Sequence, residues 1–119
     1  MTYSVIPTPK FEEDLDFYER KRKYTKIEDD LDNVIQELKK GNLIGDEIPD
    51  IKLPASEDAF KVRVANSNTK VGKSNGYRLI YYVVKNDREI FLLTVYYKKD
   101  GNRILSKPEI IELINKYCK

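Results

Sequence analysis

Three runs of residues in the second half of the chain alternate between polar and apolar side chains, and they constrain the fold more than any other feature. They span residues 59–65, 76–85 and 89–97, and Asn86-Asp87 is a suitable tight turn between the last two. Successive side chains of a strand point to opposite faces of a sheet, so this alternation is typical of strands with one buried face. The runs therefore predict an antiparallel sheet formed mainly by the second half of the chain.

The first half of the chain predicts helices. Residues 1–7 form a short edge-strand candidate that ends at two prolines, and a helix follows from Lys10. A second amphipathic helix runs from about Thr25, where Thr25 and Glu28 have the spacing of a capping box, and it stops at Gly41. The two helices form a hairpin whose apolar faces need a sheet to cover.

The remaining segments complete an α+β fold. Residues 42–58 form a linker that contains two prolines, and Ser106 with Pro108 predicts the start of a short C-terminal helix. We expect one domain over residues 1–119, with two N-terminal helices packed on an antiparallel β-sheet. The other face of the sheet would be open or partly covered by the short C-terminal helix.

Composition excludes several kinds of chemistry. The 119 residues contain no histidine and one cysteine, Cys118, so an imidazole base, a histidine-ligated metal and an internal disulfide are all excluded. We expect no metal and no cofactor. No segment has the apolar length of a membrane span or of a signal peptide, which predicts a cytoplasmic protein without a membrane partner.

The charge is distributed unevenly along the chain. Residues 1–58 hold 9 Lys/Arg against 15 Asp/Glu, a balance of −6, and residues 59–119 hold 13 against 5, a balance of +8. A basic half of this size attracts phosphate backbones. The alternative is that the two halves attract each other in the folded protein.

Strand alternation brings cations to one face of the predicted sheet. Lys61, Arg63, Arg78 and Lys98 fall on that face together with Tyr82 and Tyr96. In the last strand, alternation opposes Phe91, Leu93, Val95 and Tyr97 to Ile90, Leu92, Thr94 and Tyr96. Cations neutralise phosphate and tyrosine rings stack on unpaired bases, so such a face suits RNA. The alternative is that the cations are ordinary solvated strand residues and that the tyrosines reflect strand propensity.

The loop between the first two strands is polar and basic. It runs over residues 66–76, and we expect it to flank the cationic face and to contact phosphate through Lys70 and Lys73. Its Gly72-Lys73-Ser74 segment has the ending of a nucleotide-binding P-loop, but the upstream glycine is absent and a strand follows in place of a helix. A nucleoside triphosphatase is therefore not expected.

These strand sequences resemble the RelE/ParE toxin superfamily. The residues that carry the resemblance are Phe60-Lys61-Val62-Arg63, the segment from Gly72 through Gly76-Tyr77-Arg78 to Tyr82, and the run from Phe91 to Lys98-Lys99. The loop before Gly76 is more similar to the HigB-type branch than to RelE itself. The resemblance implies the toxin of a type II toxin–antitoxin system, a ribosome-dependent endoribonuclease (mRNA interferase) that needs no metal. Its implied partners are a cognate antitoxin, the ribosome and mRNA.

The resemblance also implies roles for individual residues. The family's reaction is attack of a ribose 2′-OH on the adjacent phosphate, which needs a base, positive charge at the phosphorane and an acid for the leaving oxygen. Lys61 would lie near the 2′-OH, Arg78 would hold the scissile phosphate, and Arg63 and Lys98 would stand where RelE has a lysine and an arginine. RelE's C-terminal catalytic tyrosine has no clear counterpart. The expected RNA-binding residues are Lys70, Lys73, Tyr82, Tyr96, Tyr97 and Lys99.

Two other functions remain open at this stage. A relative similar to ParE would inhibit DNA gyrase and would lack the nuclease residues. A catalytically inert module would bind only an antitoxin or RNA. The presence of Lys61, Arg63, Arg78 and Lys98 together favours the nuclease.

Overall fold

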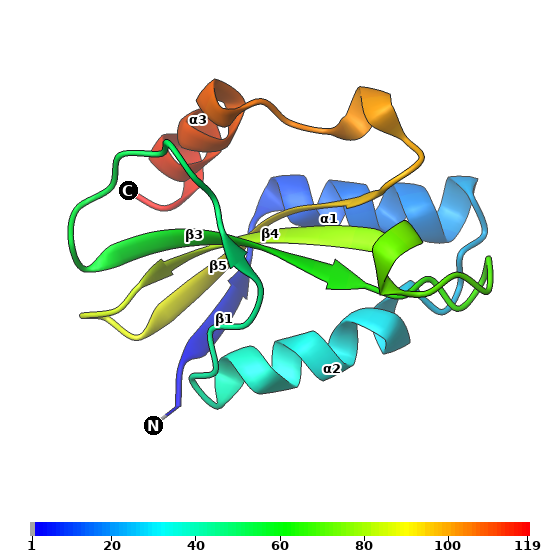
Figure 1. The fold of residues 1–119 in the computed structure, drawn as a ribbon, viewed down its shortest axis with the longest axis horizontal. Helices are drawn as coiled ribbons and strands as arrows, with labels where there is room; N and C mark the ends of the chain where they lie inside the picture. The colour runs from blue at the N-terminus through cyan, green and yellow to red at the C-terminus, as the bar shows by residue number, and fades with distance from the viewer. Residues whose placement is uncertain (1) are drawn as a thin grey trace.

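A mixed β-sheet forms the centre of the protein (Figure 1). The computed structural model describes residues 2–119, and within them five strands lie in the order β1-β5-β4-β3-β2. The strands are β1 (Ser4–Pro7), β2 (Asp46–Glu47), β3 (Glu57–Val64), β4 (Tyr77–Val84) and β5 (Glu89–Tyr97). The three strands predicted in the second half are thus confirmed to within about two residues, and β2 is a short addition from the predicted linker.

The prediction of a purely antiparallel sheet is wrong at its β1 edge. β2, β3, β4 and β5 pair antiparallel, whereas β1 lies parallel to β5. Parallel neighbours need a long connection, and here it contains both N-terminal helices and the other strands. The predicted edge strand over residues 1–7 is confirmed at Ser4–Pro7, and Met1 lies outside the described residues.

Helices cover both faces of the sheet. α1 (Pro9–Asp16) continues through a π-helical turn, η1 (Phe17–Lys21), and forms a hairpin with α2 (Ile27–Lys39). α3 (Lys107–Tyr117) lies on the other side of the sheet from α2 (Figure 1). The hairpin and α3 each bury apolar residues against their own face, so the face opposite the hairpin is partly covered.

The helix starts follow capping rules at two places and depart from them at a third. Thr8 caps α1 by accepting a hydrogen bond from the Phe11 N–H. The predicted start of the C-terminal helix at Ser106 is confirmed, and the structure adds a capping box between Ser106 and Glu109. The predicted capping box at Thr25 is wrong, because α2 begins at Ile27. The Lys26 N–H donates instead to Oδ1 of Asn68, at 2.8 Å, from the loop after β3.

A bulge in β5 changes which side chains share a face. Ile80 pairs with Thr94 but Tyr81 pairs with Leu92, which leaves Leu93 as an extra residue. Leu93 and Phe91 consequently belong to the α3 side with Tyr96, and Leu92 belongs to the hairpin side with Val95. The strict alternation predicted for this strand is therefore wrong before Thr94, and it holds after it.

Two buried carboxylates join α1 and its π-helical turn to the segment after β5. Asp14, fully buried, accepts hydrogen bonds from Lys10, Thr94 and the Val95 N–H, and it pairs with Arg103 at 2.9 Å. Asp100 accepts bonds from Tyr18 and Arg22, each at 2.8 Å. These contacts hold the segment 98–105 in place between the sheet and α3. Among residues 2–119, no helix is both long and apolar enough to cross a membrane.

Candidate nucleic-acid interface

The strand register brings four predicted cations to one face of the sheet. Lys61 and Arg63 of β3 point to the same side, and Arg63 pairs directly with Arg78 of β4. Tyr96 of the adjacent strand pairs with Arg78, and Lys98 follows Tyr96 by two positions, directly after the end of β5. We call Lys61, Arg63, Arg78 and Lys98 the cationic surface. It lies on the α3 side of the sheet.

Arg78 is the recessed member of the cationic surface. Its side chain is 9% exposed, and its guanidinium donates to three backbone carbonyls: Lys73 at 3.1 Å, Ser74 at 3.0 Å and Tyr77 at 3.3 Å. Lys98 Nζ donates to the same Ser74 carbonyl at 3.1 Å. A guanidinium has five N–H donors, so these three bonds fix its orientation and leave donors for an anion.

Gly76 is needed for the approach of the turn to β3. A Cβ at this position would lie 2.1 Å from the Val64 carbonyl oxygen, closer than any side chain permits. The turn 73–75, which supplies carbonyls to Arg78, therefore packs directly beside the end of β3. The glycine in the Gly76-Tyr77-Arg78 sequence thus has a structural reason that is separate from any contact with a ligand.

Asp46 of β2 lies directly opposite Lys61 in the strand register, but within the described residues the cations of the cationic surface are not held in ion pairs. No member forms an ion pair with a carboxylate anywhere in residues 2–119. Like charges at directly opposed strand positions, as at Arg63 and Arg78, are destabilising. An anion on this surface would relieve that repulsion. Lys61, Arg63 and Lys98 are exposed and available to one.

The basic loop after β3 is attached at both ends. Asn66 pairs with Val71, and Ser67 donates to Asp30 of α2, which directs the first part of the loop toward the helix hairpin. The exposed Lys70 lies in this part, whereas Lys73 lies in the turn that binds Arg78. Lys73 is thus the closer of the two to the cationic surface, and the exposed Lys99 follows Lys98 directly.

The predicted stacking of tyrosines on RNA bases is wrong for Tyr82 and Tyr97. Tyr82 is 1% exposed beneath the α3 side and donates to Glu57, and Tyr97 faces the hairpin, 4% exposed, with its hydroxyl bonded to Thr69. Tyr96 is also 4% exposed, so it offers no open ring face. The sequence reasoning placed Tyr82 and Tyr96 on the correct side of the sheet but underestimated how much of it α3 covers.

The Tyr82–Glu57 hydrogen bond predicts an acid-dependent difference in stability. The bond, together with Lys119 at 3.1 Å, holds the pKa of Glu57 below its ordinary value. A carboxyl group with a lowered folded-state pKa stabilises the protein above its unfolded pKa of about 4.3, and this contribution is lost as the pH falls through the folded pKa. We expect Tyr82→Phe to be less stable than wild type at pH 6 and the difference to shrink at pH 3, as measured by urea unfolding. A difference that does not change with pH would contradict this assignment.

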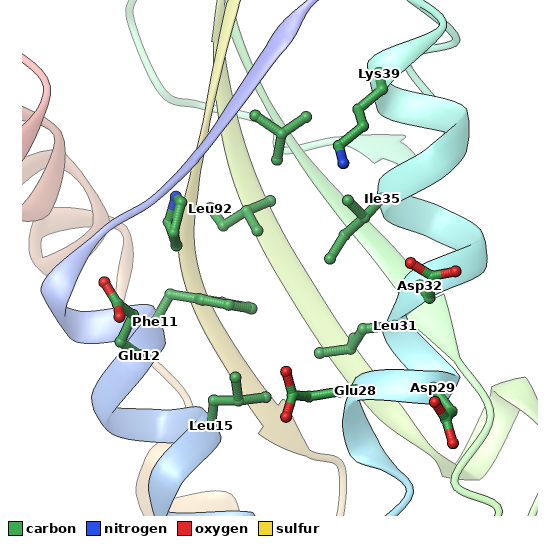
Figure 2. Close-up of a pocket in the computed structure, with 12 residues that line it drawn as sticks. Phe11, Glu12, Leu15, Glu28, Asp29, Leu31, Asp32, Ile35, Lys39 and Leu92 are labelled. Atoms are coloured by element: carbon green, nitrogen blue, oxygen red, sulfur yellow. The ribbon is translucent and has the colours of Figure 1, made fainter.

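A second concave feature, which the sequence analysis did not identify, lies between the two N-terminal helices. It is a groove of about 470 Å³ with an apolar floor, and in Figure 2 Phe11 and Leu15 of α1 face Leu31 and Ile35 of α2. Carboxylates surround this floor, from Glu12, Glu28, Asp29 and Asp32. None of the four forms an ion pair within the described part of the chain. Among the described residues, Lys39 is the one lysine or arginine of the lining, so the groove is mainly acidic and apolar, unlike the cationic surface.

Comparisons with known proteins show similarity to solved structures but not to known sequences. No family model and no curated protein matches the sequence. Among solved structures, a mutant of the E. coli toxin RelE in the free state is 19% identical, with 98% of this chain and 97% of that chain aligned and a TM-score of 0.49. The similarity concerns the course of the backbone. Within residues 2–119, no group of three or more acidic or cysteine side chains is arranged to hold a metal ion.

Proposed function

We propose that this protein is the toxin of a type II toxin–antitoxin pair and that it cleaves mRNA on the ribosome. The observation that carries the proposal is the cationic surface, where two cations of β3, one of β4 and one directly after β5 lie together without an ion-pair partner in residues 2–119. The resemblance of the same strands to the RelE/ParE superfamily supports it. The cationic surface is also the part of the chain where that resemblance is strongest.

The arrangement suits attack of a ribose 2′-OH on the neighbouring phosphate. The phosphorane that forms carries more negative charge than the phosphate, so fixed positive groups around it lower the barrier. Arg78, held by three carbonyls, is oriented before RNA binds, which avoids the cost of ordering it in the reaction. Lys61 and Arg63 lie two residues apart on one strand face, about 7 Å along it, and contact the RNA backbone. Lys98 completes the positive surface on the opposite side of Arg78.

The test is primer extension on mRNA from cells induced for this protein. We expect cuts in phase with codons, and we expect the Lys61→Ala, Arg63→Ala double variant to lose them. Both side chains are exposed, so the double variant keeps the fold, and Lys21→Ala, Lys40→Ala serves as a matched control with two exposed cations elsewhere. Intact mRNA with inhibited DNA supercoiling would point to a gyrase inhibitor. Intact mRNA without any growth effect would point to an inert binding module.

The groove between α1 and α2 supports a docking site for the cognate antitoxin. Its apolar floor and unpaired carboxylates complement an amphipathic segment with lysine or arginine beside its apolar ridge. The neighbouring gene is expected to encode this antitoxin.

Charge reversal in the groove tests this docking site. We expect the Glu28→Lys, Asp32→Lys double variant to bind the product of the adjacent gene roughly tenfold or more weakly, because like charges would then face each other. Titration calorimetry measures the affinity. The Glu13→Lys, Asp16→Lys control changes the same number of charges on α1 outside the groove, and we expect it to bind as wild type does. Equal affinities of the two double variants would contradict docking in the groove.

A further inference from the structure

A small cavity adjoins the cationic surface. It has a volume of about 280 Å³ and lies among β2, the three strands β3, β4 and β5, and the start of α3. Lys61 of the cationic surface is one of its lining residues. A molecule bound in the cavity would therefore contact the same lysine that we assign to RNA binding.

The interior of this cavity is apolar. Its lining includes Ile80 and Tyr96 of the sheet and Ile110 of α3, and all three residues are almost completely buried. At the border stands Ile104, which is 49% exposed, the most exposed large apolar side chain in the described part of the chain. The exposed Ile104 side chain is available to an apolar surface that enters the cavity, because a side chain of this size gains by burial.

The β2 side of the cavity is polar and acidic. Asp46 and Glu47 line it and both are exposed. The Glu47 side chain points to the hairpin side, because Glu47 pairs with Phe60, so Asp46 provides the carboxylate, which forms no ion pair within residues 2–119. Asp46 lies directly opposite Lys61 in the strand register. The cavity thus combines apolar walls with the carboxylate of Asp46 and with two lysines, Lys61 and Lys107.

We propose that this cavity receives one unpaired nucleobase of the RNA whose phosphates lie on the cationic surface, and that it favours a base with an exocyclic amino group. An unpaired base has two apolar ring faces, and its edge carries hydrogen-bonding groups. Ile104 contacts the ring, and the carboxylate of Asp46 accepts from the amino group, as acidic side chains do from cytosine. Lys61 contacts the phosphate of the same nucleotide. This inference rests on the proposed RNA-binding function and adds a base preference to it.

The cavity fits this occupant better than a second protein chain. Its volume is about that of a few side chains, and it borders a surface of unpaired cations, which a nucleic acid neutralises. Cytosine and uracil have nearly the same size. They differ in the group that would contact the Asp46 carboxylate, since cytosine presents an amino group and uracil presents a carbonyl oxygen. These two bases therefore provide a matched pair of probes.

Nuclear magnetic resonance of the isoleucine methyl groups tests the proposal directly. The probes are cytidine 5′-monophosphate, uridine 5′-monophosphate and ribose 5-phosphate, added to the full-length protein at low salt. We expect the Ile104 and Ile110 methyl signals to shift when either nucleotide is added. We expect the protein to bind the cytidine nucleotide at least roughly fivefold more tightly than the uridine nucleotide. Ribose 5-phosphate should leave these signals in place, because it carries no base. Shifts of equal size with ribose 5-phosphate, or no shift with any of the three probes, would overturn the proposal.

Two variants test the contribution of the apolar wall and that of the carboxylate separately. Asp46→Asn is expected to bring the affinities for the two nucleotides within about twofold, because an amide loses the purely accepting character of a carboxylate. Ile104→Ser is expected to weaken both, and Ile111→Ser, an exposed isoleucine of α3 outside the cavity lining, is the control. If the Asp46→Asn variant still prefers the cytidine nucleotide as wild type does, the proposed role of Asp46 is wrong. Because nucleotide binding needs no cleavage, a protein that binds the base but leaves mRNA intact would refute the nuclease proposal and keep the cavity.

Discussion

Replacing Asp14 by alanine is expected to lower the free energy of unfolding by roughly 3–5 kcal/mol. The Asp14 side chain is 1% exposed and balances Lys10 and Arg103, whose side chains are 23% and 21% exposed. Its removal leaves two partly buried cations without a counter-charge. The Thr94 hydroxyl and the Val95 N–H lose their acceptor as well. Urea unfolding followed by circular dichroism measures the effect.

Asp16 provides the control for this prediction. It lies two residues further along α1, and its pair with Arg20 at 2.7 Å is exposed, with side-chain exposures of 60% and 80%. Exposed ion pairs contribute little to folding stability, so we expect Asp16→Ala to change the free energy of unfolding by about 0.5 kcal/mol or less. Losses of similar size in the two variants would contradict the assignment of Asp14 as the structural carboxylate. Asp14→Asn, which keeps the shape and one acceptor, is expected to fall between them.

The buried carboxylates illustrate what the sequence could not predict. Asp14 stands in an acidic first-helix segment that reads as solvated, and its partners Thr94 and Arg103 are about 80 and 89 residues away. Local patterns contain no information on such pairs. By contrast, Ser106 and Glu109 interact with each other within one turn, and their capping box was predictable because both partners lie in the same segment.

The candidate site was predictable where strand alternation is regular. β3 and β4 pair without interruption from Glu57 to Val64, so Lys61, Arg63 and Arg78 could be assigned to one face from their sequence positions alone. The bulge at Leu93 reverses the alternation in β5, and none of the residue types around it predicts a bulge. Lys98 was nevertheless placed correctly because it follows the bulge.

Burial by α3 explains the errors among the aromatic residues. A strand pattern indicates which side of the sheet a tyrosine faces, but it does not indicate how far a later helix extends over that side. Tyr82 and Tyr96 lie on the α3 side of the sheet, where they belong to a second apolar cluster with Ile110 and Ile114 of α3. The same coverage creates the cavity beside Lys61, so the site consists of exposed cations around a covered apolar patch rather than an open aromatic face.

Single substitutions in the cationic surface are expected to separate catalysis from folding. Lys61→Ala and Arg63→Ala should each slow cleavage of ribosome-bound mRNA by roughly 10²–10³-fold, because each removes positive charge from the developing phosphorane. Both side chains are exposed and without an ion-pair partner in the described residues, so stability should change by about 0.5 kcal/mol or less. Single-turnover cleavage of a short mRNA on purified ribosomes, with thermal unfolding beside it, measures both quantities.

Arg78 is expected to behave differently, because its guanidinium also supports the turn 73–75. Arg78→Ala removes the donor for three carbonyls and should reduce both cleavage and thermal stability. Arg78→Lys keeps the charge, but a lysine cannot reach three carbonyls in a fixed plane, so we expect it to recover only part of either quantity. If Arg78→Ala keeps wild-type stability and loses cleavage alone, the carbonyl contacts do not support the turn. If Lys61→Ala and Arg63→Ala cleave at the wild-type rate, the cationic surface is not the place where RNA is cut.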